Sequence, residues 1–328
     1  MTREVTGASA EPHQHPWGWY PVAFSREVTS GKVISRKFAE SEIVIYRTET
    51  GRAHIVSPYC PHLGAHMGGA RVDRELLVCP FHAFAFAPDG RCVRTGYGTP
   101  PPRGAQLTST PVRERNGFIF AWHHQNGSPP SWEVEPFDFS GCGRGAVWSR
   151  TFQGNQIDFL ENTADIGHFS TLHHVQATLV GTPRMDGHRY ATDIDLSGFY
   201  RSELVTHAHV EVFGLGYVTV RFDMPKLGIS AIEFAGLTPE GGGAMTLRRI
   251  THGRLAGTRL PRAAAWARRP ASDLLGFALK VAGNSQVTAD VRMWSRRVVT
   301  ETPKLAQGDG PIAPARRWAQ RFYQEQEA

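Results

Sequence analysis

Short apolar runs separated by turn residues characterise the first third of the chain. Residues 43–46 (Ile-Val-Ile-Tyr) and 118–122 (Phe-Ile-Phe-Ala-Trp) are two such runs, and turn signals such as residues 88–90 (Pro-Asp-Gly) lie between them. Apolar runs bounded by Gly, Pro, Asn and Asp are typical of strands. The pattern predicts an all-β domain over residues 17–125, preceded by a loose polar tail over residues 1–16.

The pattern changes after residues 123–135, whose Gly, Pro and polar residues are typical of a linker. Residues 156–175 have a helical pattern, residues 200–252 alternate like strands, and residues 262–297 again have helical spacing. This order predicts a second domain over residues 136–328, in which helices flank a mostly antiparallel sheet. The fold class is therefore α+β.

Composition narrows the class of protein. Hydrophobic residues make up 41% of the 328 residues and charged residues 20%, which is typical of a globular chain with a sizeable core. The net charge of +6 comes from scattered Lys and Arg, which argues against a nucleic-acid binder. We find no apolar run of about 18 residues that would predict a membrane span and no signal-peptide pattern, so we expect a cytoplasmic protein.

Two short segments each offer one thiol and one imidazole. Cys60-Pro-His62 is followed by Cys79-Pro-Phe-His82. A Rieske [2Fe-2S] cluster needs two Cys on one iron and two His on the other. A structural zinc site with Cys₂His₂ ligands is the alternative, but zinc fingers place both Cys before both His. The order of the ligands therefore predicts a Rieske cluster.

Other residues near these segments have weaker signals. Gly64, Gly68 and Gly69 can bring backbone N–H groups close to inorganic sulfides. The remaining cysteines, Cys92 and Cys142, lie outside both segments, and we interpret them as small buried hydrophobic residues.

A second constellation lies in the helical segment and consists of Asp165, His168 and His173. Asp165 and His168 are neighbours on a helix face, but residues five apart point about 140° away from each other on an ideal helix. Both His can bind one metal only if the helix ends or bulges between them. A 2-His-1-carboxylate triad on Fe(II) would then need a carboxylate from another part of the chain.

These motifs resemble those of Rieske non-haem iron oxygenases. Cys60-Pro-His-Leu-Gly-Ala-His and Cys79-Pro-Phe-His look like the two cluster loops of that family. Asp165-x-x-His168-x-x-x-x-His173, behind a Glu-Asn pair, resembles its mononuclear-iron motif. The resemblance implies an oxygenase (alpha) subunit with two metal centres.

The resemblance covers nearly the full chain. The opening Gly18-Trp-Tyr-Pro-Val-Ala and the ending over residues 308–323 are similar to the 3-ketosteroid 9α-hydroxylase oxygenase and the cholesterol 7-desaturase group. Ala65 and Phe81 stand where respiratory Rieske proteins carry additional cysteines. The group implies a Rieske β-domain, a helix-grip (START-like) catalytic domain and a head-to-tail homotrimer.

The resemblance also implies a ligand set for the mononuclear iron. In that family the two His of the motif bind iron, which corresponds to His168 and His173 here. The third ligand is an Asp on a late helix, and Asp290 best matches that context. Asp273 and Glu161 are the alternatives.

By the same resemblance, Cys60, His62, Cys79 and His82 hold the [2Fe-2S] cluster. The Asp of the iron motif is not a ligand in that family. Asp165 is accordingly expected to connect the iron site to His82 of an adjacent chain and to carry electrons between subunits.

Residues 214–216 (Gly-Leu-Gly) are too short a match for a nucleotide-binding fingerprint. Electrons from NAD(P)H should therefore arrive through a ferredoxin, a flavin reductase or both. We expect the chain to use O₂ to hydroxylate, demethylate or desaturate an apolar small molecule, with a sterol or steroid as the implied substrate.

Two other functions stay open. An aromatic-acid oxygenase or O-demethylase would need an Arg that binds a carboxylate, and Arg201, Arg221 and Arg248 are candidates, although we expect them on strand surfaces. A non-catalytic Rieske electron carrier would have no metal in the second constellation.

Overall fold

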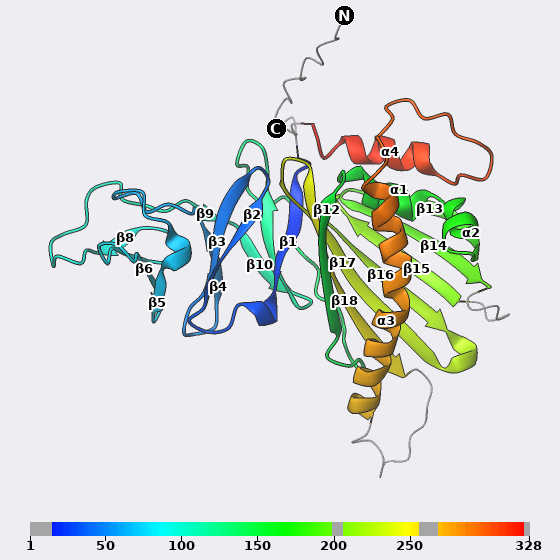
Figure 1. Cartoon of the computed structure of the whole chain (residues 1–328), viewed down its shortest axis with the longest axis horizontal. Helices are drawn as coiled ribbons and strands as arrows, with labels where there is room; N and C mark the ends of the chain where they lie inside the picture. The colour runs from blue at the N-terminus through cyan, green and yellow to red at the C-terminus, as the bar shows by residue number, and fades with distance from the viewer. Residues whose placement is uncertain (1–14, 199–205, 256–267, 325–328) are drawn as a thin grey trace, which may run out of the picture.

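The computed structural model describes residues 15–198, 206–255 and 268–324, which form two packed lobes (Figure 1). The first lobe holds the blue and cyan strands, and the second holds one large sheet with a long helix across one face. Among the helices in these ranges, none is both long and apolar enough to cross a bilayer.

Three small antiparallel sheets build the first lobe, in the orders β1-β11-β10, β2-β3-β4-β9 and β5-β6-β7-β8. Tyr20, Ile45 and Ile119 are fully buried and belong to one cluster that joins the first two sheets. The elements are β1 (Gly18–Phe24), η1 (Ser25–Glu27), β2 (Val33–Phe38), β3 (Ser41–Arg47), β4 (Ala53–Val56), η2 (Met67–Gly69), β5 (Arg71–Asp73), β6 (Leu76–Val78), β7 (Ala85–Phe86), β8 (Cys92–Arg94), β9 (Ser109–Thr110), β10 (Val112–Arg115) and β11 (Phe118–His123).

Seven antiparallel strands form the sheet of the second lobe, in the order β12-β18-β17-β16-β15-β14-β13. Apolar and polar side chains alternate along β15, so one face is buried and the other carries polar groups. The strands are β12 (Ala146–Gln153), β13 (Gln176–Asp186), β14 (Arg189–Ser197), β15 (Thr206–Phe213), β16 (Tyr217–Met224), β17 (Ile229–Gly241) and β18 (Ala244–Leu255), with η4 (Pro225–Leu227) between β16 and β17.

Four helices accompany this sheet, and α3 lies across its buried face (Figure 1). Close approach of α3 to β18 depends on two glycines, because a Cβ on Gly276 would lie 2.8 Å from the backbone nitrogen of Gly253. The packing fixes which side of α3 faces the sheet. The helices are α1 (Ile157–Ala164), α2 (His168–Leu172), α3 (Arg268–Trp294) and α4 (Ile312–Gln320).

Polar contacts to the carbonyl of Pro21 join the two lobes. Thr238 Oγ1 donates to this oxygen at 2.7 Å and Arg248 Nη1 donates to it at 3.2 Å. Arg248 is therefore buried at the lobe junction, and the expected surface position for this residue is wrong.

Three further expectations differ from the structure. The helical segment at 156–175 is two helices with a break, because Asp165 has extended backbone geometry and the next N–H, of Ile166, donates to Asp309 O in a distant loop. The expected elements leave out residues 176–197, yet these residues form β13, whose alternation is interrupted by Gly181 and Pro183, and β14. His15, in the tail expected to be loose, is only 6% exposed, and its Nε2 lies 3.1 Å from Glu40 Oε1.

Replacing Gly253 by Ala is expected to destabilise the fold. The added Cβ would lie 2.5 Å from Gly276 N and 2.7 Å from Ser272 O, which are backbone atoms of α3. The helix must move, at a cost of about 1–3 kcal/mol in the free energy of unfolding. Denaturant unfolding followed by circular dichroism measures this cost. Ala278→Leu, on the exposed side of α3, is the control, and equal losses in both variants would contradict the role of the close contact.

Candidate metal centres

The two Cys-His segments fold into loops of the same conformation. Cys60 N–H donates to the carbonyl five residues later at 2.9 Å, and Gly64 N–H donates back to Cys60 O at 2.9 Å. Cys79 makes the same pair of bonds at 2.8 and 3.2 Å, the second from Ala83 N–H. Gly64 and Ala83 both have left-handed φ values, 72° and 53°, which close the loops.

The four candidate ligands converge between these loops. Cys60 and Cys79 are buried, and their side chains are hydrogen-bonded to each other. Burial, with a smaller contribution from the neighbouring Cys79, raises the pKa of Cys60 to about 11. His62 and His82 are half-buried, with ring centroids 4.8 Å apart. A cavity of about 450 Å³ opens beside Cys79 and His82.

This donor set fits a Rieske cluster. The two thiols lie on the inner side and the two imidazoles on the outer side, and the four cysteines, all within the described ranges, form no disulfide. Buried thiols become thiolates only beside compensating positive charge, which iron would supply. Gly64 N–H donates to Cys60 O and Gly68 N–H donates to His66 Nδ1, and contact of the glycine N–H groups with inorganic sulfides stays a prediction.

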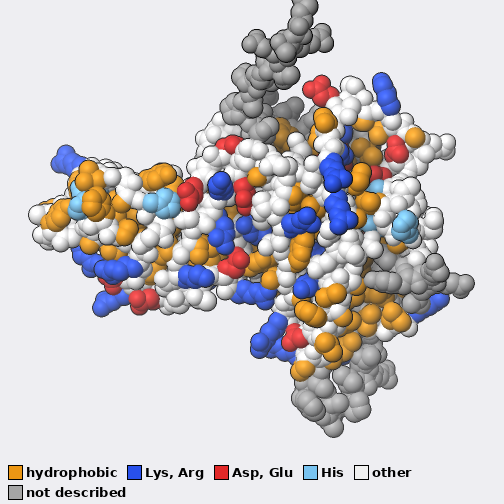
Figure 2. Space-filling view, in the orientation of Figure 1, with side chains coloured by type: hydrophobic (Ala, Val, Ile, Leu, Met, Phe, Trp, Pro, Cys, Tyr) orange, Lys and Arg blue, Asp and Glu red, His pale blue; other side chains and the backbone are white. Residues whose placement is uncertain are grey.

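Apolar side chains surround the two imidazoles at the tip of the first lobe. Leu63, Phe81 and Tyr97 are 65%, 62% and 59% exposed. Figure 2 shows this tip at the left, where hydrophobic side chains lie beside His. The outer edge of the cluster site is therefore an exposed and largely apolar surface.

In the second lobe, Asp165 is the residue at which one helix ends and the next begins. Its N–H donates to Glu161 O at 2.7 Å and ends α1, and its Oδ1 accepts from His168 N–H at 3.2 Å at the start of α2. The next residue, Ile166, donates its N–H to Asp309 O at 3.1 Å. The loop near the C-terminus thus holds the break that orients α2.

His168, His173 and Asp290 meet between α2 and α3. One ligand atom of each lies within 4.8 Å of the others. His173 Nε2 lies 2.9 Å from Asp290 Oδ1, and their side chains are 6% and 9% exposed. His173 is the C-cap of α2, its N–H still donates to Phe169 O at 3.2 Å, and its ring centroid lies 5.1 Å from that of His168. Among the His, Cys, Asp and Glu side chains of the described ranges, these are the three whose ligand atoms lie close enough together to hold one metal ion.

The hydrogen bonds of these three residues fit a metal site. His168 Nδ1 lies 2.7 Å from Asp165 O, so Nδ1–H donates to this carbonyl and Nε2 keeps its lone pair. His168 Nε2 and Asp290 Oδ1 are buried and make no hydrogen bond within the described part of the chain. Burial lowers the pKa of His168, which favours the neutral imidazole that binds metal. Two neutral imidazoles and one carboxylate are the facial ligand set of non-haem Fe(II).

The two alternative carboxylates have other partners. Glu161 forms a buried ion pair with Arg316 and another with Arg297, whose Nη2 lies 2.6 Å from Glu161 Oε2. Asp273 accepts a hydrogen bond from the backbone N–H of Arg144. Neither carboxylate belongs to the group formed by the two His and Asp290.

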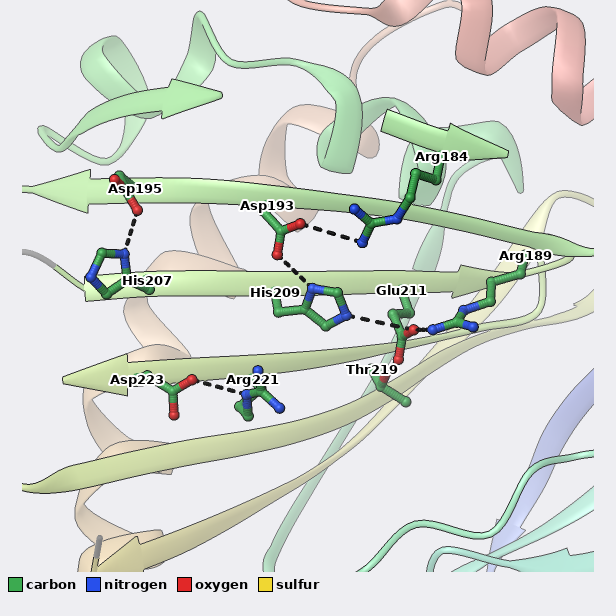
Figure 3. A network of polar contacts seen from close by, with 10 residues as sticks. All are labelled: Arg184, Arg189, Asp193, Asp195, His207, His209, Glu211, Thr219, Arg221 and Asp223. Atoms are coloured by element: carbon green, nitrogen blue, oxygen red, sulfur yellow. Dashed lines mark hydrogen bonds and ion pairs between the residues drawn. The ribbon is translucent and has the colours of Figure 1, made fainter. Parts of the chain in front are cut away.

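The polar face of the large sheet carries a separate network of paired charges (Figure 3). His209 Nδ1 lies 2.6 Å from Asp193 Oδ1, and Arg221 Nε donates to Asp223 Oδ2 at 2.9 Å. Arg221 is directly opposite His209 across β15 and β16, so both side chains point away from the face that α3 covers. Arg221 therefore cannot reach the triad, and Arg201 lies outside the described residues.

Family models match both lobes. The Rieske [2Fe-2S] domain matches residues 18–108, and the 3-ketosteroid 9alpha-hydroxylase C-terminal domain matches residues 121–323. The chain is a Rieske oxygenase of the 3-ketosteroid 9α-hydroxylase family. This membership confirms the predicted α+β fold class and decides against a non-catalytic electron carrier.

Relatives of known activity align with nearly the whole oxygenase. Cholesterol 7-desaturase nvd 1 of Ciona intestinalis is 29% identical, over 96% of this chain and 70% of its own length. The oxygenase component of 3-ketosteroid-9-alpha-monooxygenase from Rhodococcus rhodochrous is 22% identical, over 95% of this chain and 85% of its own.

Solved structures share the fold. Dicamba monooxygenase bound to 3,6-dichlorosalicylic acid superposes with a TM-score of 0.71 at 17% identity, over 93% of this chain and 96% of that one. NdmA of Pseudomonas putida CBB5 with caffeine superposes with a TM-score of 0.69 at 13% identity, over 93% and 89% of the two chains. At these identities the likeness shows the architecture alone.

Sequence analysis missed two polar residues beneath α3, Arg249 and Glu233. Arg249 is 2% exposed, and its Nη2 donates to Asn284 Oδ1 at 2.7 Å. The sequence of β18 held a signal for Arg249. Alternate residues of a strand share a face, so Arg249 lies on the same face as Leu247 and Thr251, which should be the face toward the core.

Replacing His168 by Ala is expected to remove one iron and leave the cluster intact. The wild-type oxygenase should contain about three irons and two acid-labile sulfides per chain, and the variant about two of each. Iron and sulfide assays on anaerobically purified protein measure this. His174→Asn is the matched control, because His174 is exposed, adjoins His173 and has a positive φ that Asn tolerates. Full iron content in the His168 variant would refute the ligand assignment.

Proposed function

We propose that this oxygenase uses O₂ and electrons from a separate redox partner to hydroxylate, demethylate or desaturate a sterol or steroid. The observation that carries the proposal is the buried triad beside an apolar sheet face, in a family whose relatives act on cholesterol and 3-ketosteroids by name. Val210, Val218 and Val220 belong to that face, and the last is only partly covered. An apolar polycyclic substrate matches such a surface.

Within this proposal the chain supplies two metal centres. Cys60, His62, Cys79 and His82 hold the cluster, whose half-buried imidazoles form the outlet for electrons. Imidazole ligands raise the potential of the cluster relative to an all-cysteine one.

The second centre is held by His168, His173 and Asp290. An Fe(II) ion bound there would leave positions open for O₂ beside the substrate. The chain's own residues orient this site: the Asp165 carbonyl fixes the tautomer of His168, and the close packing of α3 on β18 brings Asp290 to the same place.

The placement of the two centres supports electron transfer between subunits. The strands β5, β6 and β8 lie at one end of the chain and α2 lies at the other (Figure 1). The side chain of Asp165 is 32% exposed, so it is accessible to a neighbouring chain. In a head-to-tail homotrimer, Asp165 connects the triad to His82 of the next subunit.

A ferredoxin, a flavin reductase or both supply the electrons from NAD(P)H. The net charge of +6 is suited to an acidic partner. The exposed apolar side chains around His62 and His82 offer the docking area.

The aromatic-acid alternative has weaker support. Of the three Arg that sequence analysis considered, Arg221 is paired with Asp223 on the opposite face and Arg248 is held at the lobe junction. The described residues therefore include neither of these as a carboxylate-binding group at the triad.

Steady-state turnover tests the substrate class. The oxygenase, reconstituted with NADH, a flavin reductase and a ferredoxin, is expected to consume O₂ and a 3-ketosteroid or sterol together. Benzoate-type acids, which lack the apolar area, should give no product. Mass spectrometry of the organic phase identifies the product, and turnover of the acids without turnover of any steroid would contradict the proposal.

Asp165→Asn isolates the inter-subunit step. The amide can still accept the N–H of His168, so both centres should keep their iron, but the negative charge is lost. We expect the reduced cluster to be reoxidised about 10- to 100-fold more slowly by O₂ and steroid, as measured by stopped-flow absorbance. Asp186→Asn, in an exposed hairpin, is the control. Unchanged kinetics in the Asp165 variant would exclude the role.

A further inference from the structure

The buried face of the large sheet, under α3, is apolar with a polar interruption. Arg249 is directly opposite Ala235, and Ala235 is opposite Val218, so these three side chains share the face on which α3 lies. Glu233 lies two residues from Ala235 and belongs to the same face. A charged pair thus lies in otherwise apolar surroundings.

Arg249 is not fully hydrogen-bonded where it lies. Its Nη2 donates to Lys280 O at 3.0 Å and to Asn284 Oδ1 at 2.7 Å. Its Nε and Nη1 are buried and make no hydrogen bond in the described part of the chain. Glu233 Oε2, at 3.8 Å from Nη1, is beyond hydrogen-bonding distance. Leaving such donors unpaired is costly, so a ligand atom that pairs with them is favoured.

The free edge of Arg249 lies on the same side of α3 as the triad. A Cβ on Gly283 would lie 3.3 Å from Arg249 Nη1 and 3.6 Å from Glu233 Oε1, so this side of the helix faces the pair. Asp290 follows seven residues later, which is two helical turns and about 10 Å along the same side. Arg249 and Asp290 thus face the same side of α3, at a separation that a rigid polycyclic molecule could span.

The charge of the pair selects the kind of atom that fits. Glu233 balances the charge of Arg249, and Thr251 Oγ1 donates to Glu233 Oε1 at 3.1 Å. A substrate carboxylate would leave a net negative charge in a buried site, which is strongly disfavoured. A neutral oxygen accepts from Arg249 without this cost.

We propose that Arg249 is a substrate-positioning residue: it donates a hydrogen bond to a neutral keto or hydroxyl oxygen at the end of an apolar polycyclic substrate remote from the iron. The inference rests on the proposed function. It adds that the protein recognises a neutral oxygen of the substrate, and it gives the position of this oxygen in the site. It also assigns Gly283 a role, since any side chain there would occupy the space beside Nη1.

Equilibrium dialysis of the holoenzyme against three probes tests this. The probes are 5α-androstane, which has no oxygen, 5α-androstan-3-one and 5α-androstan-3β-ol. The wild-type protein should bind at least one oxygenated steroid about 10- to 100-fold more tightly than the hydrocarbon. Arg249→Met should bind all three with similar affinity, and Arg249→Lys, which keeps the charge and one donor group, should recover part of the preference.

Two results would overturn the assignment. One is equal binding of all three probes by the wild-type protein, and the other is an unchanged preference for oxygen in a folded Arg249→Met variant. Thermal unfolding shows whether each variant is folded. The comparison of the three probes on the wild-type protein needs no variant and tests the assignment by itself. Failure of the proposed function would give a different result. The oxygenase would then not turn over any steroid with its redox partners, whichever probe it binds more tightly.

Discussion

The position of one carboxylate depends on how closely a helix can approach a sheet. Gly276, Gly283 and Asp290 are spaced by seven residues and so lie on one side of α3. Gly276 meets the backbone of β18 at Gly253, Gly283 lies over Arg249, and Asp290 lies 2.9 Å from His173 Nε2. The proposed iron site and the proposed role of Arg249 therefore both depend on which side of α3 faces the sheet.

The other half of the triad depends on interrupted helix geometry. Residues five apart point about 140° away from each other on an ideal helix, yet the rings of His168 and His173 lie 5.1 Å apart, with His173 at the C-cap of α2 where φ is −104° and ψ is −8°. The preceding break is held by Asp309 from the C-terminal loop, which contacts Ile166. Segments far apart in the sequence thus define a site whose two His ligands are only five residues apart.

How much could be predicted from the sequence varies with the range of the interactions. The ligands Cys60 and Cys79 were predictable because each loop closes through its own backbone within five residues. Asp290 was reached only by resemblance, because its approach to His173 is a tertiary contact. β13 was hard to predict because Gly181 and Pro183 interrupt its alternation, whereas β14 contains neither residue and its alternation was overlooked. Arg249 was missed because a single Arg in a strand is read as exposed until the strand is placed under a helix.

Charge balance at three Arg residues of the second lobe bears on the proposed substrate class. Arg297 and Arg316 pair with Glu161, and Arg249 lies beside Glu233. A neutral apolar substrate, as proposed, would add no charge beside these pairs. The fold that this oxygenase shares with oxygenases of aromatic acids is thus compatible with a different chemical class of substrate.

The most direct test of the central claim is a single turnover without partner proteins. Holoenzyme reduced anaerobically and freed of reductant is mixed with isotopically labelled dioxygen and a 3-ketosteroid, and the steroid is analysed by mass spectrometry. The account predicts that the cluster is reoxidised while a product appears that contains the labelled oxygen or has lost two hydrogens. Reoxidation of the cluster with no change in the steroid would contradict it.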